Sequence, residues 1–471
     1  MDVALPERLA DLAGPILVKE VRQGLRAKAF AICFGLLLFA CLVLALNAAT
    51  QAGSEARPLG PTYLPLFFAA QSVVCLFVIP FTAYRSMARE LEEETWVLLA
   101  LTGLSARRIA FGKASSSLLQ AVLFASCCAP FVLFSYYLQG VDLLTLVVGV
   151  FLTFCACTFL VCGAVALGTE GVTRFGRRAT ELIALSLLLV AVTLAIVFGV
   201  GLANRGWRWV TDREFWICMA ALAFVLVSSA WVFLEAAAAN LALASEANTG
   251  TVRKVLLGQH VAALVGALAT ALLSPRVDRE VVAVASIVTS LMLVLTGFFL
   301  VSERDGFPVT PNWKVAWTAP GALRGWKLLL GLLLLDTVGW VGLYAGADHG
   351  HDRVLLAILA APAYVGLYLN IGVVLGRAPL FARLGSKVAT RVGFLVAVTT
   401  ASVILPVLAM FAGGRFDDPG ANCLSPTLGM IAILLDRRAP VGGLLFLWSL
   451  FLVSVPLAYH QLTLHDTGRV G

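Results

Sequence analysis

The stretch AFAICFGLLLFACLVLALNAA, residues 29–49, contains no charged side chain. A bilayer core about 30 Å thick needs roughly 20 apolar residues at 1.5 Å of rise each, so this stretch is long enough to cross it as a helix. It begins only after Lys19, Arg22, Arg26 and Lys28, and it is too long for the apolar part of a cleavable signal peptide. We therefore expect it to be the first membrane span.

Stretches of the same kind recur along the chain. The same length criterion predicts twelve spans, near 29–49, 63–84, 115–138, 142–168, 181–203, 215–245, 255–273, 280–302, 326–346, 354–376, 392–413 and 441–459. The apolar segment 424–435 is too short to cross and is typical of a re-entrant or interfacial piece. The sequence therefore predicts an all-α, polytopic integral membrane protein.

Composition supports this fold class. Hydrophobic residues make up 60% of the 471 residues and charged residues 13%, with a mean hydropathy of +0.93. Soluble domains are roughly 45–50% apolar and about 25% charged. The net charge of +7 does not indicate a nucleic-acid partner, because the basic residues form short clusters between apolar runs, as at the membrane surface. Nine of the ten cysteines lie inside apolar runs, which excludes a disulfide framework.

The basic residues also predict an orientation. With a cytoplasmic N-terminus, the cytoplasmic segments hold 24 of the 34 lysines and arginines. Cytoplasmic loops of membrane proteins carry an excess of these residues. We therefore expect both termini inside, and segments 50–62, 204–214 and 346–353 outside.

The longest polar interruption of the first half is the predicted cytoplasmic segment 85–114. It contains ARELEEETWVLLALTGLSARRIAFGK, residues 88–113, in which an acidic start, an apolar stripe and a basic end follow one another. The stripe, at helical spacing, consists of Val97, Leu98, Leu101 and Leu104. On the residues alone, an interfacial helix flanked by charges is an open interpretation.

Two stretches resemble the permeases of type-2 ABC transporters. The first is GPILVKEVRQGLRAKAF, residues 14–30, which is similar to the amphipathic entry helix of that family. The second is 88–113, which resembles the segment between spans two and three. Its matching residues are Glu90, Glu92, Thr95, Leu98, Leu99, Leu101, Thr102, Leu104, Ser105, Arg107, Arg108, Ile109, Gly112 and Lys113. Leu91, Glu94 and Gly103 depart from the usual Arg, Gly and Pro, which makes the front of the segment more negative.

The resemblance covers residues 14–245 and implies three parts. These are an entry helix over 1–28, a six-span permease domain over 29–245 with a coupling segment at 85–113, and a second six-span extension over 246–471. In that family the coupling segment docks on a separate cytosolic ATPase. The implied docking residues are Glu90, Glu92, Glu93, Thr95, Leu98, Leu101, Leu104, Arg107, Arg108 and Lys113. The resemblance further implies an exporter subunit of the bacterial cytoplasmic membrane that forms a homodimer or pairs with a similar permease.

The chain has no ATPase motif of its own. A phosphate-binding loop needs G-x-x-x-x-G-K-[ST], and the nearest candidate, Gly112-Lys113, is followed by Ala114. His349 and His351 with Asp348 and Asp352 form a polar outer loop, which is more typical of exposed side chains than of a zinc site. No metal, cofactor or catalytic residue is predicted.

Two acids inside predicted spans leave other functions open. Asp336 lies near the middle of span nine and Glu235 in the cytoplasmic half of span six; His260 and Asn370 are further polar residues. Intramembrane acids are costly and tend to be functional, so a proton-coupled carrier using both acids is one alternative. A non-transporting scaffold is another. We expect Asp336 to be structural, because the residues at helical spacing from it on its own helix do not titrate.

Overall fold

The computed structural model describes residues 15–52, 58–93, 105–170, 174–242, 249–273, 279–302, 321–345, 352–378, 386–404, 424–426, 429 and 441–466. Within these ranges every regular element is a helix, and ten helices are long and apolar enough to cross a membrane. The protein is therefore an all-α, multi-pass membrane protein. The chain forms two compact units, Met1–Glu246 and Ala247–Gly471, which divide one residue after the boundary suggested by the sequence.

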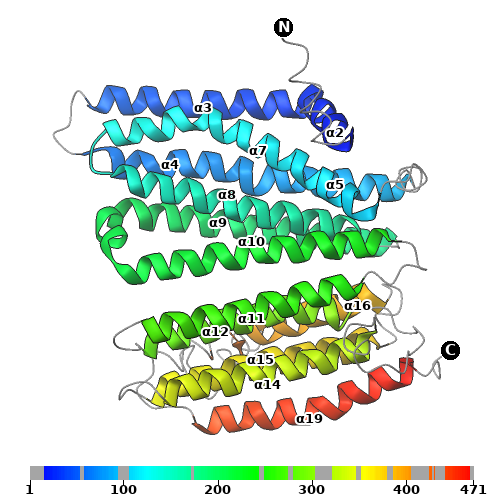
Figure 1. The fold of residues 1–471 in the computed structure, drawn as a ribbon. Helices are drawn as coiled ribbons and strands as arrows, with labels where there is room; N and C mark the ends of the chain where they lie inside the picture. The colour runs from blue at the N-terminus through cyan, green and yellow to red at the C-terminus, as the bar shows by residue number, and fades with distance from the viewer. Residues whose placement is uncertain are drawn as a thin grey trace. The chain divides into compact units, whose positions relative to one another are not determined.

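Unit 1 contains a short amphipathic helix followed by membrane helices (Figure 1). The elements are α2 (Pro15–Arg26), α3 (Lys28–Ala52), α4 (Gly60–Ser72), η1 (Val73–Val78), α5 (Ile79–Glu92), α7 (Ala106–Tyr137), α8 (Leu143–Gly168), α9 (Arg174–Thr211) and α10 (Arg213–Leu241). The helices α4, η1 and α5 follow one another without a break and form one span, Gly60–Glu92. The described part of unit 1 thus has six membrane helices.

Side-chain caps mark where two of these helices begin. The Ser105 hydroxyl accepts a hydrogen bond from the Arg108 amide (3.4 Å) at the start of α7, and the Asp142 carboxylate accepts one from the Thr145 amide (2.9 Å) at the start of α8. Such caps satisfy amides that have no partner within the helix. Of segment 85–114, which was expected as a connection, residues 85–92 belong to the end of α5 and residues 106–114 to the start of α7.

Helix α8 lies at the centre of unit 1 and packs against α5, α7, α9 and α10. Its last residue, Gly168, lies so close to α5 that a Cβ there would be 2.8 Å from the Cβ of Met87 and 2.9 Å from the Tyr84 carbonyl oxygen. Small residues allow helix backbones in membranes to approach this closely. The close packing places the ends of α5 and α8 together.

Unit 2 is also helical, and four of its described helices are long and apolar enough to cross a membrane. Its elements are α11 (Thr249–Leu273), α12 (Arg279–Leu300), α14 (Ala322–Ala345), α15 (Asp352–Gly376), α16 (Ser386–Thr399), η3 (Thr400–Ile404) and α19 (Val441–Asp466). Helix α15 is the central one: it packs against α12, α14, α16 and α19, and 78% of its membrane-spanning stretch is buried, against 28% for α14.

Two of the twelve predicted spans coincide with shorter apolar helices. Predicted spans 280–302 and 392–413 correspond to Ala285–Leu300 and Ala389–Ser402. The exact number of crossings therefore stays a prediction. Residues 1–14 of the predicted entry helix, and most of segment 424–435, lie outside the described residues.

Candidate functional site

One end of unit 1 is joined by ion pairs and hydrogen bonds between helices. We call it the polar end of unit 1: helix α2, the ends of α5, α8 and α10, and the starts of α7 and α9. The predicted coupling segment leaves α5 and enters α7 at this end. The arrangement therefore places the segment's two attachment points within one network of charged side chains.

Lys113 is the most buried charge of this network, with 4% of its side chain exposed. Its Nζ lies 2.9 Å from Glu90 Oε1 on α5 and 3.5 Å from Glu20 Oε1 on α2. It also donates a hydrogen bond to Ser86 Oγ, 2.9 Å away. A buried ammonium is tolerated only when paired in this way. Lys113 thus ties three elements, α2, α5 and α7, at one point.

Arg107 joins the same end of α7 to α10. Its Nη2 lies 2.6 Å from Glu235 Oε1, whose side chain is buried. The Arg107 guanidinium also lies over the rings of Phe111 (5.5 Å) and Trp231 (5.7 Å), a cation–π arrangement. In the sequence Glu235 is an acid inside a predicted span with no visible partner. The structure gives it one, Arg107, from another helix.

Helix α9 is linked to α5 by two further ion pairs. Arg177 lies 2.8 Å from Glu92, and Arg85 lies 3.2 Å from Glu181. The side chains of the second pair are 63% and 35% exposed, so water screens it. The same two helices are also joined by a hydrogen bond, because the Tyr84 hydroxyl on α5 lies 3.0 Å from Thr180 Oγ1 on α9. The end of α5 is thereby fixed to both α7 and α9.

The side-chain amide of Asn240 joins helices α8 and α10 at the polar end of unit 1. Asn240 donates hydrogen bonds to Thr169 Oγ1 (3.0 Å) and to Glu170 Oε1 (2.8 Å). Asn240 comes from the end of α10, and its two acceptors follow the end of α8. Every membrane helix of the described unit 1 except α3 therefore contributes to the polar end.

The residues predicted to dock an ATPase fall into three groups. Lys113 is buried and pairs with the half-buried Glu90, while Glu92 and Arg107 pair with residues of α9 and α10. Glu93 and Arg108 are exposed. Thr95, Leu98, Leu101 and Leu104 lie outside the described residues. The predicted charged residues thus lie where the segment leaves α5 and enters α7, and four of them are in ion pairs.

Sequence analysis missed the partners at this end. Glu20 is the one acid among the basic residues of α2, and that isolation was a usable signal. Nothing local in the sequence marks Arg177 as the partner of Glu92, because the two residues lie on different helices.

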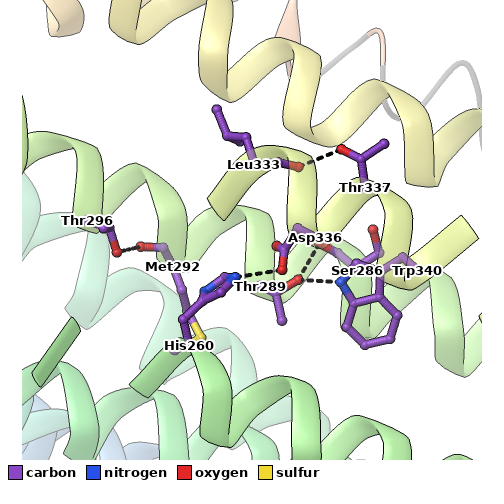
Figure 2. Close-up of polar contacts among 9 residues, drawn as sticks. All are labelled: His260, Ser286, Thr289, Met292, Thr296, Leu333, Asp336, Thr337 and Trp340. Atoms are coloured by element: carbon purple, nitrogen blue, oxygen red, sulfur yellow. Dashed lines mark hydrogen bonds and ion pairs between the residues drawn. The ribbon is translucent and has the colours of Figure 1, made fainter. Parts of the chain in front are cut away.

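A second buried polar group lies within unit 2. His260 Nε2 on α11 is 2.6 Å from Asp336 Oδ1 on α14, and both side chains are at most 2% exposed. The Trp340 indole donates a hydrogen bond to Thr289 Oγ1 on α12 (2.9 Å). Asp336 thus has a titrating partner that spacing along α14 could not reveal, because His260 lies on α11 (Figure 2); the expectation that Asp336 is structural stays a prediction. In the described residues no group of three or more His, Cys, Asp or Glu could hold a metal.

The outer loop with His349 and His351 lies outside the described residues. Neither a family model, a curated protein nor a solved structure matches the chain.

Proposed function

We propose that this protein is the membrane-spanning permease subunit of an ABC exporter in the bacterial cytoplasmic membrane. It transports a substrate with energy from ATP hydrolysed by a separate cytosolic ATPase subunit, and it acts as a homodimer or beside a similar permease. The sequence resemblance over residues 14–245 is the origin of this proposal. Since the chain has no phosphate-binding loop of its own, the ATPase must be a different polypeptide.

The contacts of Lys113 are the observation that best supports the proposal. A partner that pushes on residues 94–104 acts on the end of α5 and the start of α7 together, because Lys113 and Glu90 join them. The push then reaches α2 through Glu20 and α10 through Arg107 and Glu235. A set of helix ends held this tightly moves as one body, as a coupling site requires.

The same contacts give the docking residues two different roles, anchoring the segment or contacting a partner. The buried Lys113 and the half-buried Glu90 anchor the segment, and Glu93 and Arg108 remain exposed to a partner. The apolar stripe of Val97, Leu98, Leu101 and Leu104 supplies contact area, as amphipathic helices do in a groove. Exposed charges beside it set orientation and partner choice more than affinity.

The experiment replaces Leu98 and Leu101 by Asp. Two unpaired charges in a docking groove cost several kcal/mol, on the order of 2–5 each. The tagged full-length chain is purified in mild detergent from the cells that naturally produce it. Mass spectrometry then quantifies any co-purified protein with a phosphate-binding loop, and vanadate-sensitive ATP hydrolysis is measured. We expect the double variant to be present in the membrane and to lose both signals.

A matched control carries Ala100→Asp with Thr102→Asp, which adds the same charge between the stripe positions. We expect this control to keep most of the ATPase. A wild-type preparation that contains no ATPase, or a Leu98/Leu101 variant that retains the full amount, contradicts the proposal.

A further inference from the structure

Helix α2 is fixed to α7 along one of its faces. Glu20 Oε1 lies 3.5 Å from Lys113 Nζ, and Gly24 lies directly against the Gln120 side chain. Glu20 and Gly24 are four residues apart, so they lie on the same side of α2. Figure 1 shows α2 at the start of α3, turned away from the direction of that helix. These contacts determine which face of α2 points toward α7 and which points away from it.

The face of α2 that points away from α7 carries a row of cations. Lys19, Arg22 and Arg26 are spaced i, i+3 and i+7, which places them on one side of the helix, and all three are exposed. Lys28, the first residue of α3, is exposed as well. We call these four residues the basic face of α2. The single acid of α2 lies on the opposite face, so it does not neutralise them.

The basic face of α2 has no partner in the protein, in contrast to other cations nearby. Four cations at the polar end of unit 1 pair with carboxylates of neighbouring helices: Arg85, Arg107, Lys113 and Arg177. Within the described part of the chain, no residue of the basic face makes an ion pair or a side-chain hydrogen bond. Like charges three or four residues apart on a helix destabilise it. An anion from outside the protein would therefore stabilise this face.

An exposed apolar stripe on α3 begins at the basic face. Ile32, Leu36, Phe39 and Val43 are 47–66% exposed and recur at intervals of four, three and four residues, so they share one side of α3. Lys28 precedes Ile32 by four residues and lies at the head of this stripe. The stripe rises about 16 Å, close to one leaflet of a hydrocarbon core about 30 Å thick. Only 11% of the membrane-spanning stretch of α3 is buried within the protein.

Cations at the head of a leaflet-long apolar stripe match the two parts of a phospholipid. Lysine and arginine at a membrane surface attract anionic headgroups. A free phosphate would contact the cations and leave the stripe uncovered, whereas a phospholipid has acyl chains that cover it. The two features together therefore select a lipid as the occupant.

We propose that the basic face of α2 and the apolar stripe of α3 form a binding site for an anionic phospholipid. Its phosphate group lies among Arg22, Arg26 and Lys28, and an acyl chain lies along residues 32–43. The bound lipid holds α2 at the membrane surface and, through Glu20 and Lys113, steadies the start of α7. The site needs no ATPase, so it stands or fails separately from the proposed function.

The experiment compares two photoactivatable lipids. The full-length chain is reconstituted in phosphatidylcholine nanodiscs that contain a small fraction of phosphatidylglycerol or phosphatidylcholine with the same diazirine in an acyl chain. Mass spectrometry of proteolytic fragments measures the labelling of α3 relative to α9, whose Leu189, Leu194 and Val197 are also exposed. We expect phosphatidylglycerol to label α3 at least about fivefold more than phosphatidylcholine does, since one cation near an anionic headgroup contributes roughly that factor. The two lipids should label α9 about equally.

Arg22→Gln combined with Arg26→Gln tests the cations. Two lost cations at a factor of about five each should remove most of the excess labelling of α3 by phosphatidylglycerol. Salt at about 0.5 M should also reduce the excess, because it screens exposed charges. The matched control is Arg89→Gln with Arg178→Gln, which removes two exposed arginines from α5 and α9 at the same end of unit 1. We expect this control to keep the excess.

Five results overturn the proposal. Equal labelling of α3 by both lipids in the wild type removes the preference for an anionic headgroup, and an unchanged excess in the α2 double variant removes the role of the basic face. Loss of the excess in the control variant as well would assign it to the net charge of the polar end. Loss on addition of soluble glycerol 3-phosphate would place a free phosphate at the cations. No labelling of α3 by either lipid would place a second copy of the chain on the stripe.

Discussion

Lys113 faces two carboxylates at the polar end of unit 1, and this arrangement determines what its loss will do. Glu20 and Glu90 are 14% and 16% exposed, so neither acid is well solvated. The cation compensates for burying both. If it is removed, two like charges remain close together in a poorly solvated position. The damage comes from the acids that are left, more than from the missing hydrogen bonds.

We expect Lys113→Met to lower the unfolding free energy by about 3–5 kcal/mol, the range found when one partner of a buried ion pair is removed. Thermal unfolding in detergent, followed by tryptophan fluorescence, measures the change. The control is Arg85→Met, whose pair with Glu181 is mostly exposed and worth roughly 0–1 kcal/mol. Adding Glu20→Gln and Glu90→Gln to Lys113→Met should restore part of the loss. Equal, small effects of the two single variants would contradict the role given to Lys113.

The sequence identifies the polar residues inside the membrane spans but not their partners. Asp336, Glu235 and His260 stand out as polar groups in apolar stretches, because their cost in lipid is visible in one dimension. Their pairing is not visible, since the partner lies on another helix; His260 and Asp336 are 76 residues apart. Helical spacing relates only neighbours on the same helix. Both acids therefore looked unpaired, and both are paired.

Close approach between helices is an element-scale feature of unit 2. Gly325, in the first turn of α14, lies directly against the end of α12: a Cβ there would be 2.1 Å from the Leu300 carbonyl oxygen. The obstacle is backbone, which cannot rotate away. Gly331, on the same helix, has no atom of a described residue within 4 Å of its Cβ position.

Gly325→Ala should therefore destabilise the protein by about 1–3 kcal/mol, the usual cost of overpacking. Gly331→Ala is the matched control and should be neutral or stabilising by roughly 0.5–1 kcal/mol, because alanine favours the helix. Thermal unfolding of the purified variants, with helicity followed by circular dichroism, measures both. A Gly325 variant as stable as the Gly331 variant would show that α12 and α14 do not pack this closely.

Hydropathy found the helices but not their full length. The predicted span 115–138 corresponds to α7, which begins nine residues earlier at Ala106, and the predicted span 63–84 continues to Glu92 in α5. Nine residues at 1.5 Å add about 13 Å. The extra turns carry Arg107, Glu90 and Lys113, which an apolar-length criterion excludes. They are helical because interhelical ion pairs and the Ser105 cap stabilise them.

At the scale of the whole chain, each unit has a contact that joins two of its helix ends, and the chemistry of these two contacts differs. In unit 1 the start of α7 meets the end of α5 through Lys113 and Glu90. In unit 2 the start of α16 meets the end of α12 through Arg391 and Ser302 (3.2 Å). One contact joins opposite charges, whereas the other joins a cation to a hydroxyl. Of these two contacts, the one in unit 1 has the opposite charges on which the proposed coupling rests.

The excess of lysine and arginine on one side of the predicted spans predicts the orientation of the chain. The polar end of unit 1 should be cytoplasmic, and segments 50–62 and 346–353 should be outside. We expect a cysteine at Ser54 or Gly350 to react in intact cells or spheroplasts with a maleimide that cannot cross the membrane. A cysteine at Arg178, exposed at the start of α9, should react only after the membrane is disrupted.

The structure shows which native thiols interfere with this experiment. Cys41, Cys75, Cys128, Cys155, Cys157 and Cys162 are buried and can be kept, which avoids cavities in the core of unit 1. Cys218 is exposed, and Cys423 lies outside the described residues, so both are replaced by Ser, and Cys33 and Cys127 by Ala. The unmodified background must give no label. If Ser54→Cys and Gly350→Cys react only after disruption while Arg178→Cys reacts in intact cells, the chain is inverted, the coupling segment faces away from ATP, and the permease assignment fails with it.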